Sequence, residues 1–155
     1  MKITLTKNKR QKPDYSKLGF GKYFTDHMLV MDYRDGKWEE PEIIPYDSFK
    51  LDPSTAVLHY AQGIFEGCKA YKDNEGNITT FRTRDNFVRM NRSAERICMP
   101  TLPIDTVLEA LYELIKIDSE WIPTEAGTSL YIRPTMIATD FALGVHSSKS
   151  YKFFV

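Results

Sequence analysis

The sequence has few cysteines and no excess of charge of either sign. Its two cysteines, Cys68 and Cys98, belong to no CxxC pair and no Cys/His cluster. This pattern favours reduced thiols in a cytoplasmic protein over a disulfide framework or a zinc site, and we expect no metal site. The 21 basic residues balance the 21 acidic residues. The charge therefore gives no sign of a nucleic-acid or anionic-membrane partner.

Long apolar runs are absent as well. No stretch approaches the length of about 20 residues that crosses a membrane, and residues 1–7 lack the apolar segment of a signal peptide. A chain of 155 residues is the size of one ordinary domain and can bury most of a core. We expect a polar, lysine-rich arm over residues 1–18, followed by one domain over residues 19–155.

Residues 58–71 combine aromatic side chains with glycines, and the rest of the chain is organised around them. Neither helical nor strand periodicity runs through this segment. Because glycine permits positive φ or close approach of the backbone, we interpret the segment as a short helix or turn that runs into a strand. Residues 65–67 (Phe-Glu-Gly) lie at the junction. An ordinary loop between two core elements is an equal alternative.

Turn residues indicate two β-hairpins. Asp35-Gly36 predicts a hairpin after a strand over residues 23–30. Residues 73–77 form a turn between strands over 68–72 and 78–81. A histidine on the first strand, His27, is expected to be a structural hydrogen-bonding group. Residues 39–56 contain three prolines and are expected to be an extended connection with short edge pairing at most.

Apolar residues at helical spacing predict two helices. The first begins at Thr83, whose hydroxyl can cap it, and Pro100 and Pro103 follow its end. Its buried face is predicted to consist of Phe87, Met90, Ala94, Ile97 and Cys98. The second starts near Asp105 and is predicted to bury Val107, Leu108, Leu111, Leu114 and Ile115. The expected fold is therefore α/β (α+β), with a mostly antiparallel sheet and two main helices.

Arginines cluster on the opposite side of the first helix, at Arg89, Arg92 and Arg96. From the pattern alone a solvated face is the favoured interpretation. The alternative is an anion site facing another domain, because the planar fork of arginine suits a phosphate.

Strand alternation in residues 129–134 places Tyr131 and Arg133 on the same face, opposite Leu130 and Ile132. A phenol and a guanidinium side by side can bind a carboxylate. An exposed strand face with a surface arginine is an equal alternative. Pro134 cannot donate to a strand ladder, so the strand is expected to be at an edge or bulged just past Arg133.

The end of the chain has the pattern of a strand that begins at Tyr151 and stops on three apolar residues. A terminal core strand would produce the same pattern. We nevertheless expect a domain excised from a longer protein.

Five segments carry a resemblance to a known family. In order they are 20–28 (FGKYFTDHM), 58–71 (LHYAQGIFEGCKAY), 87–94 (FVRMNRSA), 129–134 (SLYIRP) and 143–145 (LGV). Together they resemble the N-terminal half of branched-chain amino-acid aminotransferases, which are pyridoxal-phosphate enzymes of fold type IV. The resemblance is to the longer type found in mammals and many bacteria, and it covers about residues 18–155.

The resemblance implies a small N-terminal domain, a larger C-terminal domain with the cofactor between them, and a homodimer. It implies that Arg89 holds the cofactor phosphate, which reverses the interpretation of the arginine cluster as a solvated face. It places Tyr131 near the substrate carboxylate, and it assigns to Arg133 the side-chain carboxylate of glutamate when glutamate is the amino donor.

The resemblance also implies how the pocket is lined. Phe20 and Phe65 match aromatic walls for the branched side chain. Tyr60, Leu143 and Val145 match residues that such enzymes contribute to the pocket of the neighbouring subunit. An apolar lining with one positioned arginine suits a pocket that takes leucine, isoleucine and valine as well as glutamate.

The lysine that forms a Schiff base with the cofactor lies, in this family, in the C-terminal domain. Neither Lys69 nor Lys72 stands in a matching motif, so no catalytic residue is assigned here. We expect that the chain alone has no aminotransferase activity, binds pyridoxal phosphate weakly or not at all, and exposes apolar surface. The parent is expected to move amino groups from branched-chain amino acids to 2-oxoglutarate.

Two alternatives remain open. One is another fold-type-IV enzyme, such as a D-amino-acid aminotransferase or an aminodeoxychorismate lyase. The motifs Phe-Thr-Asp-His-Met (24–28) and Leu-His-Tyr (58–60) argue against it. The other is a stand-alone binding or structural module of the same fold. The missing lysine is what that second alternative predicts.

Overall fold

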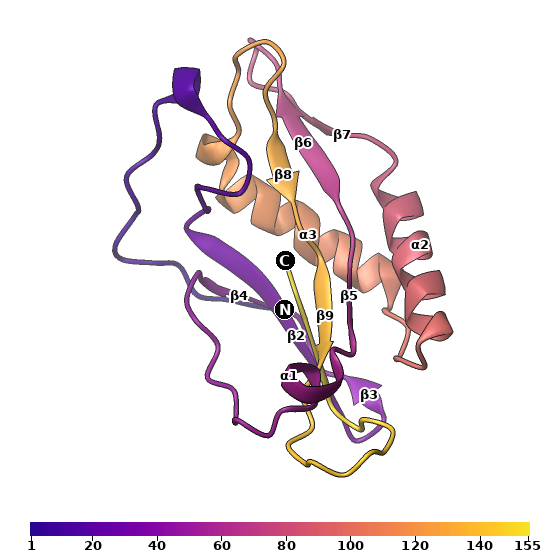
Figure 1. Ribbon diagram of the computed structural model, residues 1–155. Helices are drawn as coiled ribbons and strands as arrows, with labels where there is room; N and C mark the ends of the chain where they lie inside the picture. The colour runs from indigo at the N-terminus through magenta and orange to yellow at the C-terminus, as the bar shows by residue number, and fades with distance from the viewer.

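Most strands belong to one large, mainly antiparallel sheet, seen in a computed structural model that describes residues 1–155 (Figure 1). Its strand order is β1-β4-β2-β10-β9-β5, with β3 paired beside β2. The strands are β1 (Lys2–Ile3), β2 (His27–Arg34), β3 (Lys37–Trp38), β4 (Glu42–Pro45), β5 (Gly63–Phe65), β9 (Thr135–Ala138) and β10 (Tyr151–Phe154). Only β1 and β4 pair in parallel. The predicted hairpin is confirmed, because Asp35 and Gly36 both have positive φ, 51° and 78°, as a type I′ turn requires.

A second sheet of three strands has the order β7-β6-β8, with β6 (Cys68–Lys72), β7 (Ile78–Thr80) and β8 (Leu130–Ile132). Two adjacent connections run from one sheet to the other, from β5 to β6 and from β8 to β9. The backbone N–H of Glu66 donates to the carbonyl of Pro134 between these connections, at 2.9 Å. The antiparallel pairing therefore continues from one sheet to the other, through a bend in both connections. Pro134 follows the edge strand β8 at this bend, as its missing N–H predicted.

Three α-helices complete the fold: α1 (Ala56–Tyr60), α2 (Thr83–Arg96) and α3 (Ile104–Ile117). Short 3₁₀ segments form at η1 (Tyr15–Lys17) and η2 (Ser119–Trp121). Figure 1 shows α3 crossing behind the strands and α2 packed beside it. The predicted apolar face of α3 is buried in full. It joins Phe87 of α2 and Phe153 of β10 in the core. None of the helices is long and apolar enough to cross a lipid bilayer. The predicted fold class is thus confirmed.

The predicted ends of α2 were wrong on both sides. Thr83 does not cap the helix: Arg82 occupies the N-cap position with φ 49°, and the buried Thr83 hydroxyl has no hydrogen-bond partner. At the other end the helix stops at Arg96. Ile97 and Cys98 therefore leave the helical face and are exposed, while Phe87, Met90 and Ala94 are buried as predicted.

Two strand predictions also need correction. The first strand begins at His27 rather than residue 23, because Tyr23 and Phe24 lie exposed in the loop that precedes it. Residues 39–56 contain β4, which lies inside the large sheet between β1 and β2 and is more than an edge contact. Pro45 ends β4, so the prolines limit the length of this strand.

The N-terminal residues run along the domain and are held at the start of β2. The Thr6 N–H donates to His27 Nε2 at 2.9 Å, and the Arg10 N–H donates to Asp26 Oδ1 at 2.7 Å. His27 is buried, and its Nδ1 lies 2.8 Å from the Asp118 carboxylate. Because Nε2 accepts from a backbone N–H, Nδ1 carries the ring proton. The expected structural role of His27 is confirmed.

Candidate functional site

Tyr131 and Arg133 lie side by side at the end of β8, as strand alternation predicted. The phenol oxygen of Tyr131 accepts from Arg133 Nε at 3.2 Å and from Nη2 at 3.1 Å. The Arg133 guanidinium also lies over the ring of Phe65, 4.3 Å from its centroid. Phe20 meets the edge of the Tyr131 ring, with centroids 4.9 Å apart. Four of the residues that the sequence singled out thus form one contiguous group.

The bend between the two sheets brings Gly67 against this group. A Cβ at position 67 would lie 2.3 Å from the phenol oxygen of Tyr131 and 2.9 Å from Cζ. Real Cβ atoms do not come so close to a neighbour. The φ of Gly67 is not positive, so glycine is needed here for close approach of the ring rather than for backbone conformation.

Arg89 projects from α2 towards the same bend and pairs with Glu66. Its Nε and Nη2 atoms donate to the two carboxylate oxygens of Glu66 at 2.5 Å and 2.6 Å. The Glu66 side chain is 8% exposed, whereas the Arg89 side chain is 65% exposed. Burial opposes ionisation of Glu66, but hydrogen bonds from Arg89 and from the Gly67 N–H outweigh it and lower the pKa of the carboxyl group. The pair is therefore charged, with its guanidinium facing solvent.

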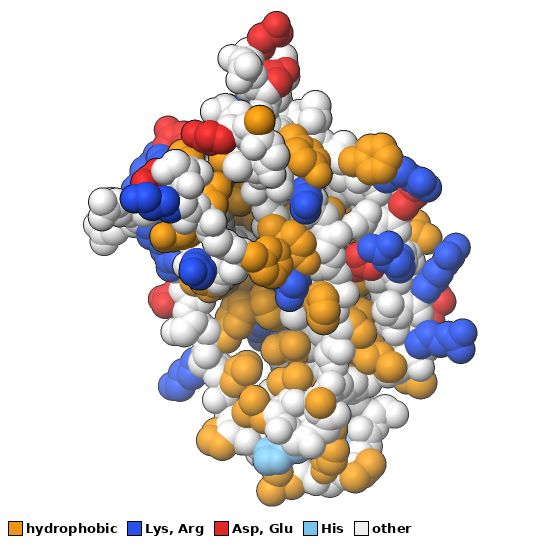
Figure 2. Space-filling view, turned by 45° about the horizontal axis from the view of Figure 1, so that its top comes forward, with side chains coloured by type: hydrophobic (Ala, Val, Ile, Leu, Met, Phe, Trp, Pro, Cys, Tyr) orange, Lys and Arg blue, Asp and Glu red, His pale blue; other side chains and the backbone are white.

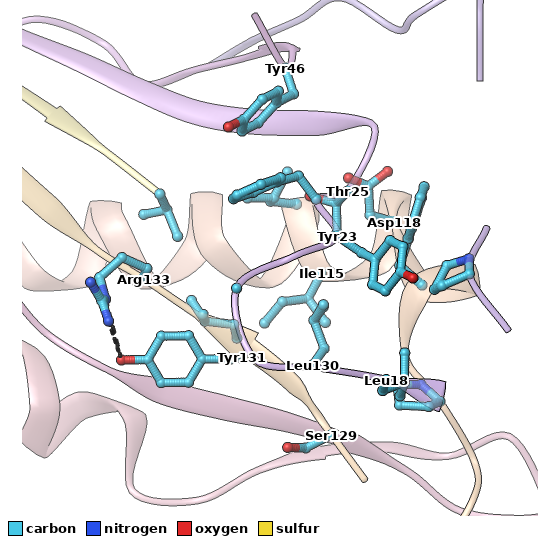
Figure 3. A pocket seen from close by; sticks show the side chains of 18 of the residues that line it. Leu18, Tyr23, Thr25, Tyr46, Ile115, Asp118, Ser129, Leu130, Tyr131 and Arg133 are labelled. Carbon is cyan, nitrogen blue, oxygen red and sulfur yellow. Dashed lines mark hydrogen bonds between the residues drawn. The ribbon is translucent and has the colours of Figure 1, made fainter. Parts of the chain in front are cut away.

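A cavity of about 370 Å³ opens beside Tyr131 and Arg133. Residues 18–25 form one wall, and Ile115 of α3 and Leu130 of β8 lie at its base (Figure 3). Tyr46 lines the side towards β2, while the hydrogen-bonded pair of Arg133 and Tyr131 lies at one end. The cavity is therefore mostly apolar with a polar end, which is the usual make-up of a small-molecule site.

Tyr60, Leu143 and Val145 form a second group, apart from the one around Tyr131. The Tyr60 hydroxyl donates to the carbonyl of Leu143 and ties the end of α1 to the loop over residues 139–150. All three side chains are exposed, Val145 to 89%. Hydrophobic side chains gather at the lower end of the molecule in Figure 2, where α1 and this loop lie. Leu58 and Phe141 add to this apolar surface.

The structure thus places the candidate residues in two groups on one molecule, with Arg89 beside the first. Arg92 and Arg96 are exposed on α2 and make no ion pair, as expected for residues on a solvated face. Sequence reasoning missed Glu66 as a partner of Arg89. The sequence signal that could have identified Glu66 is its position: a carboxylate stands between an aromatic residue and a glycine at the junction over residues 65–67. The neighbouring strand positions are largely apolar.

Comparison with known proteins gives one family. No family model matches the chain. Branched-chain-amino-acid transaminase 1 of Bacillus subtilis is 52% identical over 147 residues, which cover 94% of this chain and 41% of that protein. Branched-chain-amino-acid aminotransferase 2 of the same organism is 47% identical over 156 residues, covering 100% of this chain and 43% of the relative. The chain therefore spans about two fifths of the length of these relatives.

Solved structures agree on the fold. The branched-chain amino acid aminotransferase of Escherichia coli matches with a TM-score of 0.61 at 24% identity, over 83% of this chain and 38% of that one. The branched-chain aminotransferase of Thermoproteus uzoniensis, solved with norvaline, matches with a TM-score of 0.59 at 25% identity, over 83% and 40%. The resemblance drawn from the five sequence segments is confirmed: this chain is a homologue of the branched-chain amino-acid aminotransferases and matches their N-terminal region.

Proposed function

We propose that residues 19–155 are the small N-terminal domain of a branched-chain amino-acid aminotransferase, preceded by an arm over residues 1–18. The parent transfers the amino group of leucine, isoleucine or valine to 2-oxoglutarate with pyridoxal phosphate as cofactor. The observation that carries this proposal is the convergence of Phe20, Tyr131 and Arg133 at one cavity, with Phe65 packed against the Arg133 guanidinium. The identity of 52% to a named branched-chain transaminase supports it.

Arg89 fits the role of cofactor-phosphate ligand. Glu66 takes the N–H groups on one edge of its guanidinium, and the other edge is free and exposed. A hydrogen bond from Arg89 to Glu66 and the charge of Glu66 raise the pKa of Arg89 further, so the group is always a cation. Pyridoxal phosphate, when bound, supplies the electron sink through which an amino group leaves an amino acid. The role of Arg89 is to anchor its phosphate by charge-assisted hydrogen bonds.

The substrate site follows from the first group of residues. Phe20 and Phe65 provide aromatic surface for a branched side chain. Tyr131 supplies a hydroxyl near the substrate carboxylate, and Arg133 binds the second carboxylate of glutamate. Because Arg133 rests on Phe65, the guanidinium keeps an apolar support that also suits leucine. One pocket can then accept both kinds of substrate.

We also propose that the second group serves a neighbouring subunit in a homodimer. Tyr60, Leu143 and Val145 are too exposed to contribute to the core of their own domain. A hydrophobic surface of this kind is typical of a protein contact. The two cysteines are unpaired, which supports a cytoplasmic location.

The Schiff-base lysine is proposed to lie outside these 155 residues, in the C-terminal domain of the parent. The chain alone is then inactive and holds pyridoxal phosphate weakly or not at all. The deciding experiment is mass spectrometry of the protein isolated from its source, with borohydride reduction to fix the cofactor. We expect a mass of at least twice 18.0 kDa and a labelled lysine outside this sequence. A native mass of 18.0 kDa without bound cofactor would refute the proposal and favour a binding module of the same fold.

A further inference from the structure

Glu66 is a buried carboxylate at the bend between the two sheets. Only 7% of the residue is exposed. Its backbone is fixed by the hydrogen bond from its N–H to the carbonyl of Pro134 at 2.9 Å. Its carboxylate accepts from two nitrogen atoms of Arg89 and from the Gly67 N–H at 3.1 Å. Both the backbone and the side chain of Glu66 are thus held in place.

The geometry of the pair determines which part of Arg89 remains available. A guanidinium has five N–H groups and two edges that can each bind an anion in bidentate fashion. Glu66 occupies the edge formed by Nε and Nη2. Three N–H groups remain, two of them on the edge formed by Nη1 and Nη2, and the Arg89 side chain is 65% exposed. A second anion can therefore bind Arg89 without displacing Glu66.

Stability alone gives no strong reason for a buried carboxylate at this position. Removing a carboxylate from water is costly, and apolar replacements of buried ion pairs are often neutral or stabilising. A held guanidinium, however, loses its side-chain freedom on folding rather than on binding a ligand. Without a partner, the long side chain of an exposed arginine would sample many rotamers.

We propose that Glu66 is a positioning residue for the anion site: it holds one edge of Arg89 so that the opposite edge is presented to the phosphate of the cofactor. This inference rests on the proposed role of Arg89 as phosphate ligand. It adds a residue that acts through Arg89 and touches neither substrate nor cofactor itself. Phe65, Glu66 and Gly67 then each support a different functional side chain: Arg133, Arg89 and Tyr131.

The test compares two ligands that differ only in the phosphate. The full-length parent is freed of cofactor and titrated with pyridoxal phosphate and with pyridoxal, and the ratio of the two dissociation constants is measured. In Glu66→Gln the amide nitrogen faces a donor of Arg89, so the held geometry is lost. We expect the dissociation constant for pyridoxal phosphate to rise by about 10- to 100-fold, and that for pyridoxal to stay within about twofold.

Two further variants identify the cause. Arg92→Gln is the matched control, because Arg92 is an exposed arginine on the same helix without an ion pair, and its ratio should equal that of the unmodified protein. Arg89→Gln removes the proposed phosphate ligand itself and should lower the preference for the phosphorylated ligand at least as much as Glu66→Gln. The thermal midpoint of each cofactor-free variant shows whether it is folded. If Glu66→Gln is unfolded, Glu66→Asp, whose shorter side chain cannot reach both nitrogens, takes its place.

The outcomes separate the inference from the function on which it rests. A loss of preference in Arg89→Gln but not in the Glu66 variant would overturn the positioning role and leave the role of Arg89 intact. No loss in either variant would overturn both. An equal weakening of pyridoxal phosphate and pyridoxal in the Glu66 variant would also overturn positioning, because it would indicate general damage to the site.

Discussion

Replacing Gly67 by alanine should displace Tyr131 and destabilise the protein. The added Cβ would lie 2.3 Å from the phenol oxygen, 2.9 Å from Cζ and 3.1 Å from Cε2. The oxygen must retreat by about 1 Å to reach ordinary contact distance. Phe20 packs against the same ring and Arg133 is hydrogen-bonded to its hydroxyl, so the movement disturbs both. Overpacking of this kind costs about 1–3 kcal/mol, and we expect a loss within that range.

The assay is urea unfolding followed by tryptophan fluorescence, with the free energy of unfolding taken from the midpoint at constant slope. Gly144→Ala is the matched control, because Gly144 has no positive φ and no atom within 4 Å of the added Cβ. It should change the free energy of unfolding by no more than about 0.5 kcal/mol. Combining Gly67→Ala with Tyr131→Phe removes the atom in closest contact and should recover part of the loss. A Gly67→Ala protein as stable as the control would refute the packing described for this bend.

Three other predictions follow from the site and its surroundings. In the parent enzyme, Arg133→Gln should lower kcat/KM for glutamate by about 10- to 100-fold and kcat/KM for leucine by much less, because only glutamate presents a second carboxylate. Equal losses of kcat/KM for the two substrates would contradict the role of Arg133. Burial opposes ionisation of Asp26, but hydrogen bonds from the Arg10 N–H and Trp121 Nε1 outweigh it and lower its pKa. Its contribution to stability is therefore complete above the unfolded pKa of about 3.9 and is lost as the pH falls through the lower folded pKa. Asp26→Asn should flatten the loss of stability in acid, measured by the fluorescence of Trp121; an unchanged acid profile would show that Asp26 carries no such linkage. Burial raises the pKa of the Cys68 thiol to about 11, whereas Cys98 is exposed. A thiol reagent should therefore react with one cysteine in the native protein and with two after unfolding. Rapid reaction of both cysteines in the native protein would be inconsistent with the burial of Cys68.

Several elements could be predicted because their signals are local. The hairpin at Asp35-Gly36 needs only two residues that accept positive φ, and the buried face of α3 needs only the 3.6-residue period. Alternation along β8 likewise places Tyr131 and Arg133 on one face. These features depend on neighbours in the sequence, so no knowledge of the fold was required.

Errors arose where distant contacts overrode local preference. Thr83 is a good N-cap residue by type, but packing buries its hydroxyl, and Arg82 takes the N-cap position. Ile97 continues the apolar period of α2, but the helix ends one residue earlier. Phe24 lies in a segment with strand-like composition, yet the strand starts only at His27. The hydrogen-bond network around Asp26 and His27, which includes Arg10 and Asp118, determines that boundary.

The sequence by itself carried the resemblance to branched-chain amino-acid aminotransferases, the succession of hairpins and helices, and which side chains share a strand face. It did so because periodicity, turn residues and ordered motifs are properties of neighbouring positions. Only the tertiary structure decided that Glu66 holds Arg89, 23 positions away, and that Gly67 makes room for Tyr131. Periodicity specifies the direction in which a side chain points. The partner it meets there depends on how two sheets bend at the same place, and no local pattern encodes that bend.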